Sequence, residues 1–369
     1  MEKTIKYIGL DVHKKSISIG IADEGRDGDV RYYGKIDNDM NQLDKVIRKL
    51  ISKGAVLKFV YEAGPCGYAI YRYLTNNDTD CVVIAPSKIP LHSGDRLKND
   101  KRDCLSLARL HRAGELTVVY VPTEDDEALR DLVRAREDAV CALRVAKQQL
   151  GAFLLRHDTV FSGKSKWSKA HFNWLADIAM PHPAQQIVLQ EYIDTVTSCS
   201  NRVQRLTEQV RQQSKQSRQH ELIQALQAMR GISLIVAATI AAELGDLTRF
   251  ENPGKLMAFL GLIPSEHSSG ERVSKGSITK TGNRHVRKAL ITAAHAYRFP
   301  ARKSRAIRKR QEDLPEGVTE ISWKAQCRLC TRYTYLTAKG KNANVTKTAI
   351  AREIAGFSWA IAQELSKAA

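Results

Sequence analysis

The stretch "IKYIGLDVHKKSISIGIAD", residues 5–23, contains two runs in which apolar residues alternate with polar residues or glycine. Alternation with a period of two is typical of β-strands, and the polar residues between the runs indicate a turn. We therefore expect two strands here, the first of which ends near Asp11. The segment "DVRYYGKI", residues 29–36, predicts a third strand, so the chain opens with three meandering strands.

The following eighty residues alternate between helical and strand patterns. Helices are expected at 40–51, at 68–74 and in the second half of 93–114, and strands at 57–64 and 80–86. The order of three strands, helix, strand, helix, strand, helix is that of a ribonuclease-H-like α/β domain. Topology rules alone leave other α/β folds open. We assign this domain to residues 1–120.

The middle of the chain, residues 121–220, is predicted to be helical. Its two long helical patterns, 123–157 and 186–219, could pair as an antiparallel coiled coil. Between them, "GKSKWSKAHFNWL" mixes lysines with aromatic residues, a combination that can stack on single-stranded bases. A surface helix with buried Trp167 and Trp174 explains the same pattern, and both interpretations stay open. The candidate nucleic-acid contacts here are Lys164, Lys166, Trp167 and Lys169.

The last part, residues 221–369, is predicted to be mainly α-helical. The segment "MRGISLIVAATIAAELG", residues 229–245, has the shape of a helix-hairpin-helix, whose turn can offer backbone N–H groups to a phosphate. An ordinary helical hairpin is the alternative.

The charge balance indicates a polyanionic partner. The chain of 369 residues carries a formal net charge of +18, and nucleic acid is the commonest partner of so basic a protein. Residues 272–310 include 13 Lys or Arg and no Asp or Glu. We expect a nucleic-acid-binding surface there, with candidate contacts Arg272, Lys275, Lys280, Arg284, Arg287 and Lys288.

An anionic membrane surface is the weaker alternative partner. Neither a signal peptide nor an apolar run of 18 residues is evident, so no membrane partner is expected. Seven scattered cysteines fit a reducing compartment, which favours a cytoplasmic location.

Four acidic residues occupy the ends of predicted strands or the start of a helix. Asp11 and Glu62 end two strands that are neighbours in a ribonuclease-H-like sheet, and Asp100 and Asp103 share one face of a helix. Two carboxylates about 4 Å apart repel by roughly 4 kcal/mol at a dielectric near 20, so four together require a cation. Oxygen ligands suit Mg²⁺ or Mn²⁺, and two such ions could clamp a phosphodiester exchange.

Each acid also has a structural explanation. Asp11 could belong to a turn, and Asp100 or Asp103 could cap the helix. The fold class also includes sugar kinases and actin-like ATPases, but these need a glycine-rich hairpin after the first aspartate. Here "VHKK" follows Asp11, which argues against phosphate binding of that kind.

Several motifs, taken in order, resemble one known family. "YIGLDVHKKSISIGI", "VYEAGPCGY", "RLKNDKRDCLSLARL", "GLIPSEHSSG" and "KTGNRHVRKALITAAHAYR" are similar to segments of DEDD-type insertion-sequence transposases, the one-ten family, and most of all its eleven-eleven branch. The resemblance implies a RuvC-like N-terminal domain, similar to Holliday-junction resolvases, and a helical transposase domain. It also implies that Asp11, Glu62, Asp100 and Asp103 bind Mg²⁺ (or Mn²⁺), in total two ions. It matches the family's catalytic serine with Ser269, rather than Ser268.

The resemblance further implies a function. Members act as bacterial, nucleoid-associated recombinases that form a serine–DNA intermediate. A structured non-coding bridge RNA pairs with double-stranded donor and target DNA, and the protein assembles as dimers and tetramers. His267 could assist Ser269 as a base. The alternative is a metal-dependent, resolvase-like endonuclease in which water attacks the phosphodiester.

Overall fold

The computed structural model describes residues 4–52, 54–90, 99–266, 268–269 and 274–368. The chain divides into two compact units, Met1–Val121 and Pro122–Ala369, and each is described by itself. His267 and Arg272, two residues with predicted roles, lie outside the described residues.

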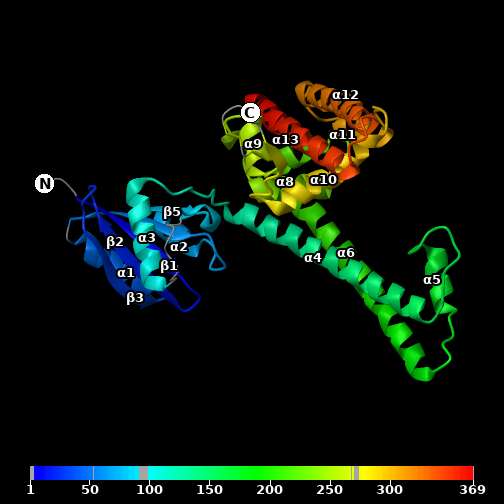
Figure 1. The fold of residues 1–369 in the computed structure, drawn as a ribbon, viewed down its shortest axis with the longest axis horizontal. Coiled ribbons are helices and arrows are strands. Elements are labelled where there is room, and N and C mark those ends of the chain that lie inside the picture. Colours follow the sequence, from blue (N-terminus) through cyan, green and yellow to red (C-terminus); the bar gives the residue numbers. More distant parts are fainter. Residues whose placement is uncertain (1–3, 53, 91–98, 267, 270–273, 369) are drawn as a thin grey trace. The chain divides into compact units, whose positions relative to one another are not determined.

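The first unit is built on a five-stranded sheet with the order β3-β2-β1-β4-β5 (Figure 1). β1 pairs antiparallel with β2 and parallel with β4, so the strands that carry Asp11 and Glu62 are neighbours, as expected. The α/β prediction is thereby confirmed. The strands are β1 (Ile5–Val12), β2 (Ser16–Asp23), β3 (Val30–Asp37), β4 (Val56–Glu62) and β5 (Asp80–Ile84).

The two faces of the sheet are covered by different helices. Leu10 and Tyr61 share a core with buried side chains of α1 (Met40–Ile51) and α2 (Ala69–Asn76). On the opposite face, Val60 packs against Leu107 of α3 (Asp100–Ala113). Because side chains alternate along a strand, Asp11 and Glu62 belong to the face that α3 covers. A 3-10 turn (Pro86–Lys88) follows β5.

α3 lies very close to the sheet because two glycines face it. A Cβ on Gly9 would lie 2.2 Å from the carbonyl oxygen of Cys104, and a Cβ on Gly20 would lie 2.6 Å from it. The side chain of Asn99 caps α3 by accepting hydrogen bonds from two backbone N–H groups of its first turn. Asp100 and Asp103 are therefore not needed as caps, and the capping alternative for them is wrong.

The second unit begins with a long helical hairpin. α4 (Glu124–Arg156) and α6 (Pro183–Gln216) run side by side in opposite directions (Figure 1). Arg136 donates a hydrogen bond to Thr207, and the rings of Phe153 and Tyr192 lie 5.5 Å apart, which sets the antiparallel register. The connection between them carries the short helix α5 (Lys169–Ala176). Whether the packing has coiled-coil geometry stays a prediction.

The remainder of the second unit is mostly helical, which confirms the expectation for the C-terminal region. Its core surrounds α8 (Leu234–Leu244), whose side chains include several fully buried alanines. A two-stranded antiparallel hairpin of β6 (Pro264–Glu266) and β7 (Lys275–Ile278) interrupts the run of helices. The other elements are α7 (His220–Leu226), a 3-10 turn (Leu247–Arg249), α9 (Pro253–Phe259), α10 (Arg284–Ala294), a second 3-10 turn (His295–Arg298), α11 (Arg305–Gln311), α12 (Glu316–Ala338) and α13 (Ala343–Ala368). Over the described residues, no helix is both long and apolar enough to cross a membrane.

The glycine of the predicted helix-hairpin-helix turn has a packing role. α7 ends at Leu226, earlier than the sequence pattern suggests, and turns lead from it to α8. Gly231 has a φ of 82°, and a Cβ there would lie 2.4 Å from the carbonyl oxygen of Ala293 in α10. Contact with the chain's own helix thus accounts for this glycine without a bound phosphate.

Candidate active site

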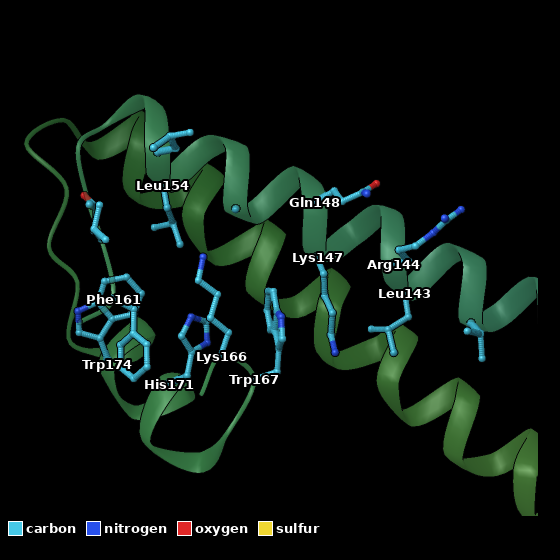
Figure 2. Close-up of a pocket in the computed structure, with 15 residues that line it drawn as sticks. Leu143, Arg144, Lys147, Gln148, Leu154, Phe161, Lys166, Trp167, His171 and Trp174 are labelled. Carbon is cyan, nitrogen blue, oxygen red and sulfur yellow. The ribbon is translucent and has the colours of Figure 1, made fainter. Parts of the chain in front are cut away.

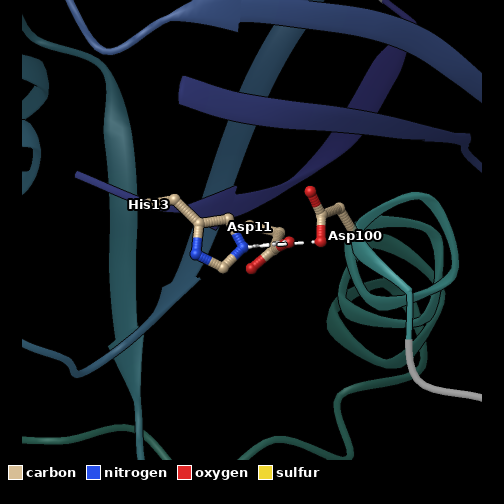
Figure 3. A group of neighbouring side chains, drawn as sticks. All are labelled: Asp11, His13 and Asp100. Carbon is tan, nitrogen blue, oxygen red and sulfur yellow. Dashed lines mark hydrogen bonds and ion pairs between the residues drawn. The ribbon is translucent and has the colours of Figure 1, made fainter. Parts of the chain in front are cut away.

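Two aspartates and a histidine converge where β1 ends and α3 begins. The Nε2 atom of His13 lies 3.1 Å from Oδ2 of Asp11 and 3.6 Å from Oδ1 of Asp100 (Figure 3). One ligand atom from each of the three residues lies within 4.8 Å of the others. β1 supplies Asp11, the turn after it supplies His13, and the first turn of α3 supplies Asp100. The grouping depends on the close packing of α3 on the sheet.

The two aspartates have different electrostatic surroundings. Burial raises the pKa of Asp11 above its ordinary value, and the neighbouring charges of Asp100 and Asp103 raise it further, while His13 acts in the opposite direction. A hydrogen bond from Lys35 lowers the pKa of Asp100, with Nζ of Lys35 3.0 Å from Oδ2. The centre thus holds one carboxylate, Asp11, in an environment unfavourable to its charge and another, Asp100, that the ammonium group of Lys35 neutralises.

The other two predicted ligands lie on the same side of the sheet. The β1–β4 register ends with the pair Leu10 and Tyr61, so the next residues along the two strands are Asp11 and Glu62. Asp103 is close enough to Asp11 for its charge to act on it. The structure groups Asp11 and Asp100 tightly, with His13 as an addition that the sequence reasoning did not include. The signal available in the sequence was a histidine two residues after an acid at a strand end.

The residues at this centre fit a divalent cation. Carboxylate oxygens are the ligands that Mg²⁺ and Mn²⁺ prefer, and imidazole nitrogen is compatible with Mn²⁺. Ser18 lies opposite Asp11 in the β1–β2 register. Its hydroxyl is buried and has no hydrogen-bond partner among the described residues. Unfavourable placement of Asp11 and an unsatisfied polar group beside it are features of a site arranged for a ligand rather than for stability.

The second candidate site is the β6–β7 hairpin, which carries both serines between its strands. Ser268 donates a hydrogen bond of 2.8 Å to Oε1 of Glu266 and accepts one from the backbone N–H of Ser274. Its hydroxyl therefore helps to hold the hairpin together. Ser269 is exposed, and its side chain has no hydrogen bond to another described residue. Both serines are exposed, and they differ in that the hydroxyl of Ser268 forms hydrogen bonds with described residues whereas that of Ser269 forms none.

The base of this hairpin is fixed by close backbone contacts. Gly261 and Gly282 have φ values of 60° and 67°, and a Cβ on Gly282 would lie 1.9 Å from the carbonyl oxygen of Phe259. Arg287 donates hydrogen bonds to the carbonyl oxygens of Leu260 and Thr281. The guanidinium of Arg287 therefore anchors the hairpin, and a contact between Arg287 and a phosphate stays a prediction.

A buried ion pair joins α8 to the long hairpin. Arg134 donates two hydrogen bonds to Glu243, whose side chain is only 2% exposed, and Asn283 donates a third. Burial alone would raise the pKa of Glu243, but the bonds from Arg134 and Asn283 outweigh it and lower that pKa. Asn283 also caps α10. The chain directly after the serine hairpin is thereby tied to α4 and α8.

The other predicted basic contacts vary in their surroundings. Lys275, Lys280 and Arg284 are exposed. Lys288 is exposed too, but its Nζ lies 2.5 Å from Glu137 of α4. In the α4–α6 connection, Lys164, Lys166 and Lys169 are exposed, whereas Trp167 is half-buried in an aromatic cluster. The structure thus agrees with parts of both interpretations of the aromatic–basic segment.

Comparison with known proteins gives a consistent picture. Residues 8–158 match the family DEDD_Tnp_IS110 (Transposase), and residues 223–309 match the Transposase IS116/IS110/IS902 family. A protein of Sinorhizobium fredii named as a transposase, y4qE, is 45% identical over 97% of this chain and 88% of its own length. The transposase for insertion sequence element IS1533 of Leptospira borgpetersenii is 28% identical over 91% of this chain and 97% of its own length. The transposase for insertion sequence element IS1111A of Coxiella burnetii is 23% identical over 80% of this chain and 78% of its own length.

Proposed function

Because the chain belongs to the IS110/IS116/IS902 family of transposases, enzymes that act on DNA, we propose that it cleaves and exchanges DNA strands with divalent metal ions and a covalent serine intermediate. The observation that carries this proposal is the convergence of Asp11, His13 and Asp100 at the start of α3. We regard the first unit as a RuvC-like catalytic domain and the second as a helical linker, 121–220, followed by a transposase domain, 221–369.

The metal ligands in this proposal are Asp11, Glu62, Asp100 and Asp103, which would hold up to two Mg²⁺ or Mn²⁺ ions. When bound, such ions stabilise the charge on the phosphate and lower the pKa of an attacking hydroxyl. Asp11 supplies a partly buried carboxylate at the centre, where the imidazole of His13 is its neighbour. Lys35 forms an ion pair with Oδ2 of Asp100, so a cation that binds this carboxylate would share it with the ammonium group.

Ser269 is the proposed nucleophile. Its Oγ forms a bond to a phosphorus atom of the DNA backbone while the bond from phosphorus to the leaving sugar oxygen breaks. The serine proton passes to water, and the leaving oxygen takes up a proton. Attack of another sugar hydroxyl on the same phosphorus releases Ser269 and joins the new strand. This choice is supported by the hydrogen bonds of the Ser268 hydroxyl to Glu266 and Ser274, since the Ser269 hydroxyl has no such bond to a described residue.

The nucleic-acid partners in this proposal are double-stranded donor and target DNA and a structured non-coding guide RNA. Exposed Lys275, Lys280 and Arg284 would neutralise phosphates near the serine hairpin. Lys164, Lys166 and Lys169 would do so at the end of the long helical hairpin. The proposed assembly is a homodimer that pairs into a tetramer, with the serine and the acidic centre contributed by different subunits.

A water-activating endonuclease is the second candidate, since the carboxylate centre alone would suffice for hydrolysis. Both candidates require the metal centre, and Asp11→Asn tests it. We expect at least a hundredfold loss of Mg²⁺-dependent strand cleavage with full binding of nucleic acid retained. Asp29→Asn is the matched control, because Asp29 is an exposed aspartate that forms an ion pair with Arg31. Cleavage by Asp11→Asn at the rate of the control variant would refute the metal site.

A further inference from the structure

A large cavity lies between α4 and the segment that connects it to α6. Its volume is about 610 Å³, within the range of small-molecule sites. One face of α4, from Val140 to Leu155, forms one wall. Figure 2 shows the opposite wall, where the rings of Phe161, Trp167, His171 and Trp174 face the helix. The site therefore has flat aromatic surfaces opposite an aliphatic helix face.

The charged residues that line this cavity are all positive. Arg144, Lys147 and Lys166 contribute to the walls, and no acidic residue is among the lining residues. Nζ of Lys147 lies 4.8 Å from the centre of the Trp167 ring. Trp167 has a φ of 66°, a conformation that residues other than glycine seldom adopt. Residues held in such conformations occur often at binding sites. The indole of Trp167 is thus held next to the ammonium group of Lys147.

His171 adds an unsatisfied polar atom. The residue is 2% exposed, and its Nδ1 atom is buried without a hydrogen-bond partner among the described residues. Three aromatic rings surround it, those of Phe161, Trp167 and Trp174, at centroid distances of 4.8, 5.0 and 5.4 Å. Burial, and then the charge of Lys166, lower the pKa of His171, so its imidazole is neutral at pH 7. A neutral imidazole offers one donor and one acceptor to a bound group.

Gly151 in the middle of α4 provides an independent observation. Glycine destabilises a helix interior, and here a Cβ would meet no atom within 4 Å. Packing within the described chain therefore does not require glycine at this position. Gly151 lines the cavity, and its missing side chain leaves the helix wall open to an occupant.

We propose that this cavity receives an unpaired nucleobase of a single-stranded nucleic acid, stacked against Trp167 and Trp174, with the adjoining phosphates at Arg144, Lys147 and Lys166. Bases stack on aromatic side chains whatever their identity, and cations beside the stack bind the backbone. An apolar side chain from a second copy of the chain would use the same rings but not the three cations. The inference deepens the proposed function, because it states how the enzyme holds unpaired nucleotides.

Gly151→Leu tests the cavity, since its Cβ meets no atom within 4 Å and the larger side chain then extends into the space that an occupant would need. Fluorescence anisotropy of the full-length protein in EDTA would measure the affinity for labelled 12-nucleotide strands of RNA and of DNA. We expect at least tenfold weaker binding of single strands by Gly151→Leu, and unchanged affinity for an abasic strand and for a DNA duplex. Gly151→Ala, a better helix former with a small side chain, is the matched control and should bind within threefold of wild type.

Trp167→Ala provides a second variant, and its affinity for single strands should fall by a similar factor. A weaker effect on one of the two strand types identifies RNA or DNA as the source of the base. Binding by Gly151→Leu equal to that of wild type would overturn the proposal. So would loss of self-association in light scattering with single-strand affinity intact, which would make the cavity a protein interface. Asp11→Asn separates the two proposals, because it should lose cleavage but bind the 12-nucleotide strands normally.

Discussion

Gly9 and Gly20 lie directly opposite each other on β1 and β2, and both lie beneath the carbonyl group of Cys104 in α3. Neither can carry a side chain unless the helix moves, because the nearest atoms belong to the helix backbone. Asp11 follows Gly9 by two residues and lies on the same face of the sheet. Asp100 lies one helical turn before Cys104. The pair of glycines therefore sets the distance between the two aspartates.

This relationship predicts that Gly9→Ala increases the distance between Asp11 and Asp100. The methyl group forces α3 away from the sheet, so we expect a loss of about 1–3 kcal/mol in the free energy of unfolding. The increase in melting temperature that Mn²⁺ causes should also be smaller for Gly9→Ala than for wild type. Differential scanning fluorimetry with and without Mn²⁺ measures both effects. Gly151→Ala is the control, since its new methyl group meets no atom within 4 Å. An unchanged metal response in Gly9→Ala would contradict this account of the glycines.

The titration of Asp11 predicts how pH affects metal binding. Its folded pKa is raised above the ordinary value of 3.8, so the protonated form is the one that folding favours. Any stability from this group is present at low pH and lost as the pH rises through the folded pKa. Protons should therefore compete with metal at higher pH than an ordinary aspartate would allow.

Asp11→Asn provides the corresponding measurement. In EDTA at pH 7 the variant should be at least as stable as wild type, because a partly buried charge has been removed. The difference should vanish below pH 3.8, where the wild-type group is neutral. With Mn²⁺, isothermal titration calorimetry should show binding by wild type and little by the variant. Marked destabilisation of the metal-free variant at pH 7 would show that Asp11 has a structural role instead.

The ion pair between Arg134 and Glu243 predicts a stability effect far from the acidic centre. Arg134→Ala leaves the carboxylate of Glu243 buried, with the bond from Asn283 and the nearby His285 to offset its charge. We expect a loss of about 1–3 kcal/mol in the free energy of unfolding. The loss should diminish as the pH falls through the lowered pKa of Glu243, where the pair no longer contributes.

Urea unfolding of the full chain measures this loss. Arg211→Ala is the matched control, because Arg211 forms an exposed pair with Glu208 one helical turn away. Such pairs contribute about 0.3–0.5 kcal/mol. Equal effects of the two substitutions would argue against a buried, anchoring role for Arg134.

Two arginines near the serine hairpin should respond in opposite ways to substitution. Arg287→Ala removes the donor for two backbone carbonyl groups, so we expect a loss of about 1–3 kcal/mol in stability. Arg284→Ala should leave stability unchanged within about 0.5 kcal/mol and lower the salt dependence of DNA affinity by the contribution of about one phosphate contact. Thermal unfolding and anisotropy titrations at several salt concentrations test both. The reverse assignment of the two effects would show that our distinction between them is wrong.

Periodicity predicted most of the first unit because alternating strands and amphipathic helices carry their pattern locally. The segments 40–51 and 57–62 contain the expected elements, and the neighbouring positions of β1 and β4 follow from known topology. His13 was missed because its role depends on the approach of α3, which is a tertiary contact. Gly9 and Gly20 gave no signal for the same reason, since a glycine in a strand does not show what lies above it.

In the second unit, long-range contacts decided what the sequence left open. Arg287 belongs to a run of basic residues, which predicts a phosphate contact but not the two backbone carbonyl groups that the fold brings to its guanidinium. The aromatic–basic segment supported two interpretations, and the structure contains parts of both: a half-buried aromatic cluster and exposed lysines beside a cavity. Composition and periodicity do not distinguish Ser268 from Ser269. The family resemblance favours Ser269, and the hydrogen bonds of Ser268 to Glu266 and Ser274 are compatible with that choice.

The central claim is that Ser269 becomes covalently attached to DNA, and denaturing gel electrophoresis of the protein with labelled DNA, guide RNA and Mg²⁺ tests it most directly. Wild type and Ser268→Ala should give a protein–DNA adduct that survives denaturation, and Ser269→Ala should give none while still binding nucleic acid. An adduct formed by Ser269→Ala, or strand cleavage by wild type without any adduct, would contradict the claim, and the latter result would favour attack by water.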